Sequence, residues 1–369
     1  MSPLTSADPL LAELLERRGG PVVTAVLSAP GFEGDTAARM GIRGKELRAA
    51  LEDVELPAEV VDAAVAVVES HVGEDALGIV ADADGLLVSS LVDVGESEEI
   101  VQAEALPRYV PFLRDRFERR PHLVVRADRR GAQVARVERG EISRDTEVTG
   151  PGDETQLRKV QAGGWSNKRF QNRAEHTWDQ NAQEVAEAVA SEADAIAAEL
   201  IVVTGDERAV NLVAEHLPER LRDHLVLDDH QPFDDESDAA VFDRATTLLR
   251  DRVGREIVDV LERFGEARGR DDGAADDDAD VLAALRTGAV ATLLVSGDSG
   301  ERVHVAADDP MQVSTRAEDL TGLGFDEVLE CRLTDAAVQA ALAGGAEIVI
   351  VPEHGPNSPD GALGAILRY

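Results

Sequence analysis

The chain has 369 residues, of which 43% are hydrophobic and 30% charged, and its formal net charge is −36. A chain of this length is longer than a single domain usually is, so two or three domains are expected. The composition is that of a soluble folded protein. The single cysteine, Cys331, excludes an internal disulfide and a cysteine-rich metal site, and no apolar run approaches the ~20 residues needed to cross a bilayer. We therefore expect a cytoplasmic protein that makes no use of a membrane.

The first third, residues 1–118, is expected to form an N-terminal α/β domain. The β-branched run PVVTAVLSAP predicts a first strand, and residues 39–52 and 57–70 have helical patterns. Two short strands are expected around a turn at residues 82–85. The proline-containing, arginine-rich segment ALPRYVPFLRDRFERRP is interpreted as the connector that ends this domain.

The second domain is expected over residues 119–235. It begins with a predicted β-hairpin that turns between Asp128 and Gly131. A long helix is predicted after residue 165, because apolar residues recur at spacings of three or four from Phe170 to Leu200, with Trp178 among them. The strand LIVVTG, a helix at residues 207–216 and the strand HLVLDD follow it.

The third domain, residues 236–369, is predicted to open with a long helix at residues 239–268. The aspartate-rich run that follows, with an insert at 271–280, is interpreted as a solvated loop. Helical and strand patterns then alternate to the end of the chain. The sequence thus predicts an α/β fold of three consecutive α/β domains.

Positive charge is concentrated in the middle of this acidic chain. Residues 108–144 contain eleven arginines and five acidic residues, and residues 155–173 contain five basic residues and no acidic one: Arg158, Lys159, Lys168, Arg169 and Arg173. Such a concentration is typical of a surface that binds phosphate groups of nucleic acid. An arginine-rich hinge that pairs with acidic neighbouring domains is the alternative, and charge alone does not separate the two.

A glycine pair lies within the acid-free window. Gly163 and Gly164 can adopt backbone angles closed to other residues and let a partner approach the main chain closely. Ser166 or Asn167 could cap the helix that follows, and its N-terminal amides favour anions. A glycine pair in such surroundings indicates a nucleic-acid contact more strongly than a glycine pair alone.

The segment GGWSNKRFQNRAEH resembles the GGQ motif of the archaeal and eukaryotic class-one release factor and Pelota family. The matching residues, at unchanged spacing, are Gly163, Gly164, Ser166, Arg169, Phe170 and Arg173. In addition, DVLAALRTGAVATLLVSGD and the final GALGAILRY are similar to the start and end of that family's C-terminal domain. The resemblance implies the release factor order of domains, with residues 1–118 equivalent to the decoding-side domain.

Position 165 departs from the family motif. The resemblance implies that the glycines place a glutamine in the peptidyl-transferase centre, where it helps water attack the ester between peptide and tRNA. Trp165 has one N–H donor and no acceptor, so it cannot replace that side chain, although its backbone N–H could face a developing oxyanion. The indole could stack on a nucleotide base, worth ~1–3 kcal/mol. Alternatively, it folds back onto its own domain.

The family's decoding loop has no clear counterpart in the first domain. The segment GIRGKELR lies in roughly the corresponding place, and Arg43, Lys45 and Arg48 could contact ribosomal RNA there. A solvated helix start is the favoured interpretation of these three residues. Stop-codon reading is therefore not indicated.

The bacterial Balon-type hibernation factors, which lack a working GGQ, are the branch most similar in this respect. This resemblance implies a factor that binds the ribosomal A site without normal hydrolysis, protects or shuts down idle ribosomes and is delivered with elongation factor Tu. The alternatives are a peptidyl-tRNA hydrolase or rescue factor, and an adaptor that binds tRNA or other RNA off the ribosome. No cofactor or metal is expected, because His224 and His230 fit no metal-ligand spacing and no phosphate-binding glycine loop is present.

Overall fold

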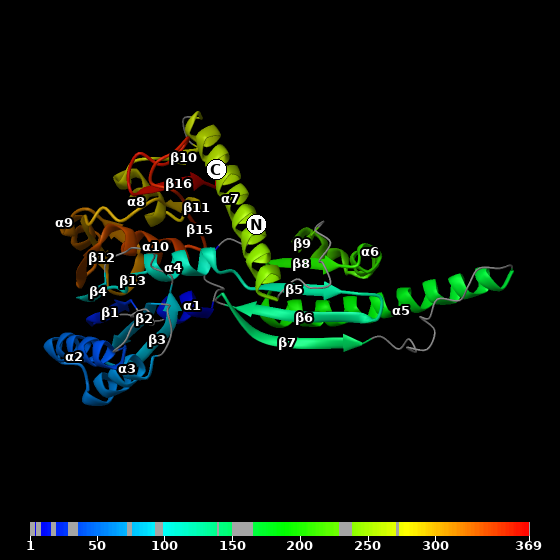
Figure 1. Cartoon of the computed structure of the whole chain (residues 1–369). Coiled ribbons are helices and arrows are strands. Elements are labelled where there is room, and N and C mark those ends of the chain that lie inside the picture. Colours follow the sequence, from blue (N-terminus) through cyan, green and yellow to red (C-terminus); the bar gives the residue numbers. More distant parts are fainter. Residues whose placement is uncertain are drawn as a thin grey trace. The chain divides into compact units, whose positions relative to one another are not determined.

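The structure is a computed structural model that describes residue 4 and residues 9–15, 20–28, 36–71, 76–92, 99–138, 140–149, 165–228, 238–270 and 273–368 (Figure 1). It is of mixed α/β class with four sheets, as the sequence predicted. The chain forms two compact units: residues 1–117 together with 254–369, and residues 118–253. The division into three domains at residues 118 and 235 stays a prediction.

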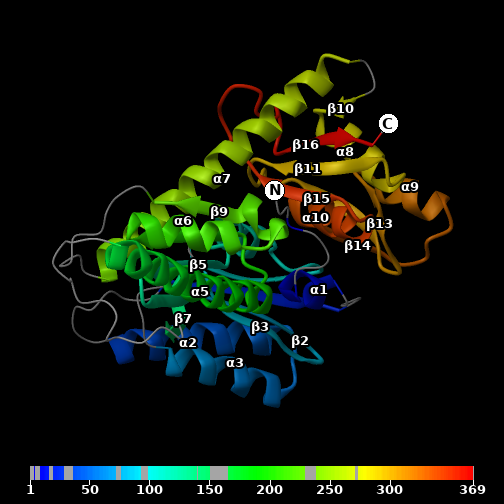
Figure 2. The ribbon, with the colours of Figure 1, turned by 90° about the vertical axis from the view of Figure 1, so that its right-hand side faces the viewer.

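The N-terminal part of the first unit is built on an antiparallel sheet of order β3-β2-β1-β4. The strands are β1 (Val22–Leu27), β2 (Ala76–Asp82), β3 (Gly85–Val92) and β4 (Ile100–Glu104). Helices α2 (Thr36–Asp53) and α3 (Ala58–Ser70) lie side by side against this sheet (Figure 2), and α1 (Pro9–Leu15) contacts β3. Every residue of β1 and β2 is buried, which fits their largely apolar sequences.

The connector expected after residue 105 contains a helix, α4 (Val110–Glu118), so that interpretation was wrong. Pro111 lies in the first turn, where a missing N–H costs no helical hydrogen bond. Phe112, Leu113 and Phe117 are buried, and a side chain on Gly78 of β2 would come within 2.6 Å of the Phe112 ring. The helix is therefore stabilised by tertiary packing, which the proline-containing sequence did not indicate.

The C-terminal part of the first unit contains two sheets. One has the order β10-β16-β11-β15, with strands β10 (Ala274–Ala275), β16 (Leu363–Leu367), β11 (Val290–Val295) and β15 (Glu347–Ile350). The other, of order β13-β12-β14, consists of β12 (Arg302–Ala306), β13 (Asp309–Ser314) and β14 (Val328–Arg332). Helices α8 (Asp278–Arg286), α9 (Ala317–Gly322) and α10 (Leu333–Ala343) accompany them, and Leu4 bridges to Ile348 of β15.

The aspartate-rich run is not simply a solvated loop, as the sequence had suggested. Ala274 and Ala275 form β10, and the side chain of Asp277 accepts the backbone N–H of Ala279 and so caps α8. Asp276 pairs with Arg268 at 2.7 Å and accepts the backbone N–H of Asp360 at 3.0 Å. These four residues, 274–277, thus order the start of the C-terminal sheet.

The second unit is a five-stranded sheet of order β7-β6-β5-β8-β9. Strands β5 (His122–Ala127), β8 (Leu200–Gly205) and β9 (Leu225–Leu227) are parallel, whereas β6 (Gly131–Glu138) and β7 (Glu141–Thr149) continue the sheet antiparallel. The β5–β6 hairpin confirms the predicted turn. Helices α5 (Trp165–Ile196) and α6 (Glu207–His216), a 3-10 turn (Glu219–His224) and the first half of α7 (Asp238–Arg268) complete the unit.

Candidate nucleic-acid interface

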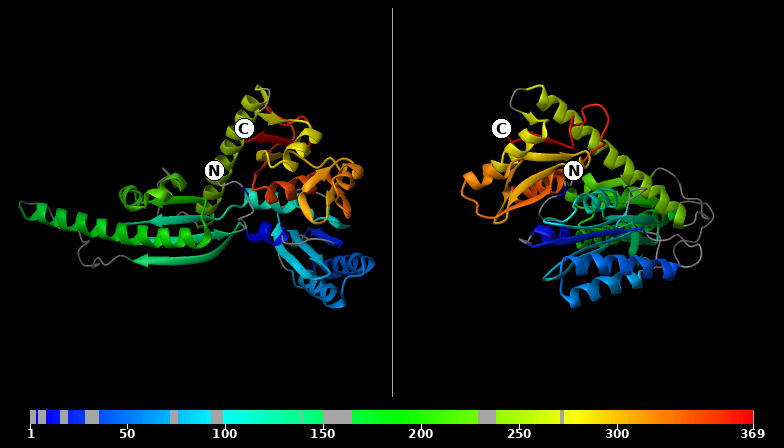
Figure 3. Two further views of the ribbon diagram at one scale, coloured as in Figure 1. Left: turned by 180° about the vertical axis from the view of Figure 1, so that it is seen from behind. Right: turned by 90° about the vertical axis from the view of Figure 1, so that its left-hand side faces the viewer.

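The long helix expected after the glycine pair is present as α5, which begins at Trp165 and has 32 residues. Its N-terminal part extends past the ends of β5, β6 and β7 (Figures 1 and 3). Gly163, Gly164, Arg158 and Lys159 lie outside the described residues. Trp165, Ser166, Asn167, Lys168, Arg169 and Arg173 all lie on this first part of α5, where the backbone but not the side chains is described.

The other half of α5 is held against the sheet by small and branched side chains. Ala182, Val185, Val189 and Ala193, at spacings of three or four, are buried in one core with the strands β5, β6 and β8. The helix ends at Ile196, and the left-handed backbone of Ala197 (φ 49) turns the chain into β8. Leu200, which the apolar spacing had included, therefore belongs to the strand.

A cluster around Trp178 forms where α5 passes the carboxyl ends of β5 and β8. The guanidinium carbons of Arg129 and Arg208 lie 4.7 and 5.0 Å from the centre of the Trp178 ring, within cation–π range. Asn181 donates from Nδ2 to the carbonyl oxygen of Arg129 at 2.9 Å. We call Arg129, Trp178, Asn181, Asp206 and Arg208 the Trp178 cluster.

Asp206 joins the parts of this cluster. Its Oδ1 accepts the backbone N–H groups of Arg208 and Ala209 and caps α6, while its Oδ2 accepts from Nε of Arg129 at 3.1 Å. The preceding Gly205 has φ 132, and a Cβ there would lie 1.9 Å from the carbonyl oxygen of Ala127. Only glycine permits this close approach. The sequence showed Trp178 only as an apolar helix position, and nothing in the spacing indicated its stacking partners.

Several arginines of the basic stretch 108–144 form ion pairs within their own unit. Arg120, whose side chain is 3% exposed, pairs with Glu199 at 3.2 Å, and Arg136 pairs with Glu192. Arg129 pairs with Asp206. By contrast, Arg130 and Arg144 are exposed to solvent. Part of the positive charge that suggested a phosphate-binding surface therefore stabilises the fold.

The three basic residues of α2 that the sequence analysis singled out have different surroundings. Arg43 donates to the carbonyl oxygen of Ser28 and pairs with Glu99. Arg48 pairs with Asp62 at 2.8 Å, and this hydrogen bond raises the pKa of the guanidinium. Lys45 is exposed, beside the exposed apolar side chain of Ile42. Of the three, Arg43 is the most fully engaged within the protein.

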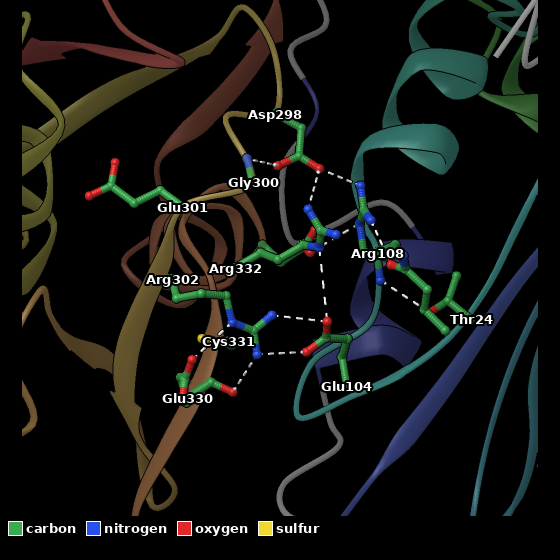
Figure 4. Close-up of polar contacts among 12 residues, drawn as sticks. Thr24, Glu104, Arg108, Asp298, Gly300, Glu301, Arg302, Glu330, Cys331 and Arg332 are labelled. Carbon is green, nitrogen blue, oxygen red and sulfur yellow. Dashed lines mark hydrogen bonds and ion pairs between the residues drawn. The ribbon is translucent and has the colours of Figure 1, made fainter. Parts of the chain in front are cut away.

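A second charged cluster, which the sequence did not reveal, lies within the first unit (Figure 4). Arg108, which precedes α4, pairs with Asp298, and Arg332 pairs with the same carboxylate at 3.3 Å. Arg302 bridges Glu104 at 2.9 Å and Glu330 at 3.1 Å. These pairs connect residues near 105 with residues near 300 and 330, and so tie the two parts of this unit together.

Two further sequence expectations concern metals and membranes. Among the described residues, no group of three or more His, Cys, Asp or Glu side chains is placed to hold a metal ion. Nδ1 of His224 lies 3.0 Å from the carbonyl oxygen of Glu199, and His230 lies outside the described residues. In the part of the chain that the structure describes, no helix is long and apolar enough to span a membrane.

Comparison with known proteins finds a family model that matches the middle of the chain. Residues 121–270, which include the glycine pair, α5 and the Trp178 cluster, match the family model of bacterial archaeo-eukaryotic release factor family 2. Over these residues, the chain is similar to the bacterial archaeo-eukaryotic release factors. Over 343 residues, covering 91% of this chain and 90% of the other, it is also 27% identical to the protein Rv2629 of Mycobacterium tuberculosis.

Solved structures of similar proteins include two archaeal factors. An archaeal Pelota, described in a ribosome-bound model with ABCE1, is 17% identical, with 100% of this chain and 95% of that chain covered and a TM-score of 0.40. An archaeal translation termination factor is 16% identical, with 98% and 96% covered and a TM-score of 0.23. The similarity to release factors is therefore carried by residues 121–270.

Proposed function

We propose that this release factor-like protein binds the A site of the ribosome and acts as a hibernation or protecting factor without normal peptide release. The feature that supports this most directly is Trp165, which begins a 32-residue helix and which the motif resemblance aligns with the family's catalytic glutamine. The helix extends past its sheet (Figure 3), so the first residues of α5 are suited to reach a distant site. The match over residues 121–270 supplies the family context.

The chemistry of the loop favours binding over hydrolysis. A glutamine side chain has both donors and an acceptor with which to hold water, whereas indole has a single donor. An indole can stack on a base of ribosomal RNA or tRNA, and the basic residues around it would neutralise phosphates. For this role the binding residues are Arg158, Lys159, Ser166, Asn167, Lys168, Arg169 and Arg173.

In the decoding-side domain, we expect Lys45 to contribute more to ribosomal RNA binding than Arg43 or Arg48. Lys45 is exposed, while Arg43 and Arg48 have carboxylate partners that an RNA phosphate would have to displace. Elongation factor Tu as a delivery partner belongs to the same proposal and is tested by adding it with and without GTP. tRNA is a further partner if the ester-bearing end of a P-site tRNA contacts the loop.

The test combines sedimentation with an ester-cleavage assay on the same sample. The purified protein is expected to sediment with vacant bacterial ribosomes and to leave peptidyl-tRNA intact. Trp165→Ala should weaken binding roughly 5- to 150-fold, which corresponds to the ~1–3 kcal/mol of one stacked base.

Two other outcomes would replace the proposal. Peptide release that survives Trp165→Ala but is lost when Gly163 and Gly164 are substituted would identify a hydrolase that uses a backbone amide. Salt-sensitive binding to free tRNA as tight as binding to ribosomes would indicate an adaptor that works off the ribosome.

A further inference from the structure

Helix α5 has a packed half and a projecting half. Ala182, Val185, Val189 and Ala193 are buried in the core of the sheet, whereas His176 is exposed. Among the side chains that are described on α5, Trp178 is the first large apolar one from the N-terminal end. The segment before it, residues 165–177, corresponds to roughly 20 Å of helix at about 1.5 Å per residue.

A projecting helix magnifies any change of direction at its base. Because the first turn of α5 lies roughly 20 Å from Trp178, a rotation of the helix by about 10° at Trp178 would move that turn by roughly 3–4 Å. A displacement of this size is enough to separate a stacked ring or a hydrogen-bonding group from its partner. The direction of α5 at Trp178 therefore decides where position 165 can reach.

The Trp178 cluster connects α5, at the point where its projecting part begins, to two other elements. Arg129 comes from the β5–β6 turn and Arg208 from the first turn of α6, and both lie within 5.0 Å of the ring centre. Asn181, one turn further along α5 and 4% exposed, binds the backbone of the same β5–β6 turn. Asp206 links the turn to α6 through Arg129. Three elements are thus joined at one ring.

The ring face, not the ring N–H, makes these contacts. Nε1 of Trp178 is buried and has no hydrogen-bond partner among the described groups. A tryptophan whose only polar atom is unused offers mainly its flat aromatic surface. This surface is what two guanidinium groups require and what an aliphatic side chain lacks.

We propose that Trp178 is a positioning residue, which fixes the direction of the projecting part of α5 and thereby the reach of Trp165 at the start of this helix. This inference rests on the proposed function for its biological meaning, because it concerns how the loop is presented. The geometric part of the inference can be measured without a ribosome. Failure of the positioning role of Trp178 can therefore be distinguished from failure of the proposed ribosome binding.

The test is a distance distribution from paired spin labels on the full chain. One label at Gln171→Cys on the projecting segment and one at Glu147→Cys on exposed β7 report the direction of the helix. The native Cys331 is buried, and burial raises the pKa of its thiol to about 12, so it should not take up label. A second pair, Ser191→Cys with Glu147→Cys, reports whether the packed half of α5 remains in place.

For the first label pair we expect one narrow distribution in the unsubstituted background and in Trp178→Phe, which keeps an aromatic face. Trp178→Leu should broaden or shift that distribution and leave the second pair unchanged. An unchanged first pair in Trp178→Leu would overturn the proposal. Broadening of both pairs would also overturn it, because Trp178 would then be needed for the fold of the whole unit.

Ribosome sedimentation of the same variants adds a functional readout. Weaker binding of Trp178→Leu than of Trp178→Phe, with an altered first pair, supports positioning of the loop. In a second outcome, the distances of the first label pair change in Trp178→Leu but its ribosome binding does not. The ring would then set the helix direction, but the ribosome would not contact the projecting end of α5. The proposed link to the reach of Trp165 would be wrong.

Discussion

Nε of Arg108 lies 3.4 Å from Oδ2 of Asp335, whose side chain is 2% exposed. Asp335 lies in the first turn of α10, and its Oδ1 also accepts the backbone N–H of Tyr109 at 3.0 Å. One buried carboxyl group thus accepts a backbone N–H and forms an ion pair with a guanidinium, both from the segment that leads into α4. Arg108 extends the contact to Asp298. This arrangement explains how the N-terminal and C-terminal stretches of the chain become one unit.

Removal of Arg108 is expected to be costly. In Arg108→Ala, Asp335 and Asp298 would lose a guanidinium that is itself only 10% exposed, and loss of one partner of a buried pair costs ~3–5 kcal/mol. Denaturant unfolding at about pH 8, where the Asp335 carboxyl is ionised, measures this change. The control is Arg316→Ala, whose pair with Glu318 is 69% and 77% exposed, so its expected cost is ~0–1 kcal/mol. Equal effects of the two substitutions would contradict the importance of the Arg108 contacts.

Asp335 should make stability depend on pH. Burial raises the pKa of its carboxyl from 3.8 to about 7, against the opposing effect of Arg108. Because the folded state then binds the proton more tightly than the unfolded state, its contribution is complete below the ordinary pKa and is lost as pH rises through about 7. Asp335→Asn keeps an oxygen acceptor for Tyr109 but cannot ionise.

Denaturant unfolding of this variant at several pH values checks the sign. Relative to the wild type, Asp335→Asn should gain stability as pH increases from about 4 to 8. Asp326→Asn, at an exposed position in the same unit, is the matched control for loss of one carboxyl group. A stability difference between Asp335→Asn and wild type that does not change over this range would contradict a buried protonated carboxyl at position 335.

Gly205→Ala should destabilise the second unit. The added Cβ would lie 1.9 Å from the carbonyl oxygen of Ala127, and the φ of 132 is unfavourable for alanine. The carboxyl ends of β5 and β8 would have to separate, at an expected cost of ~1–3 kcal/mol. Thermal or denaturant unfolding measures this cost, with Gly254→Ala as the control, because its added Cβ meets nothing within 4 Å. Equal stability of the two variants would show that the close approach is not required.

Trp165→Gln should restore the GGQ motif of the release factor family at residues 163–165. If the tryptophan is what prevents ester cleavage, this variant should release peptide from ribosome-bound peptidyl-tRNA faster than the wild type, because glutamine can hold a water molecule. Trp165→Ala is the control and should remain inactive. Release by the wild-type protein at the rate of Trp165→Gln would contradict the proposed loss of hydrolysis.

Local sequence patterns predicted many elements well. The turn between Asp128 and Gly131, the helix α6 and the long helix α7 follow from turn residues and helical spacing, which depend on neighbours in the chain. Helix α4 was missed because its prolines suggested a connector, although Phe112 and Phe117 are buried. Here tertiary packing outweighed local propensity.

Contacts between distant residues could not be predicted in the same way. Arg108 and Asp298 are 190 positions apart, and neither stands out among the charged residues of this acidic chain. Trp178 was identified as a helix position, but its contacts with Arg129 and Arg208 depend on how β5, β8 and α6 meet. The candidate loop was found from the sequence alone, by its glycines and its acid-free basic window. Its functional role stays a prediction.

The most direct test of the proposed function is a cryo-EM map of the protein with bacterial ribosomes that hold peptidyl-tRNA in the P site. We expect density for the second unit in the A site, with Trp165 beside the peptidyl-transferase centre and the peptide still attached to its tRNA. An empty A site, or a bound protein beside a tRNA that has lost its peptide, would contradict a non-hydrolysing A-site factor.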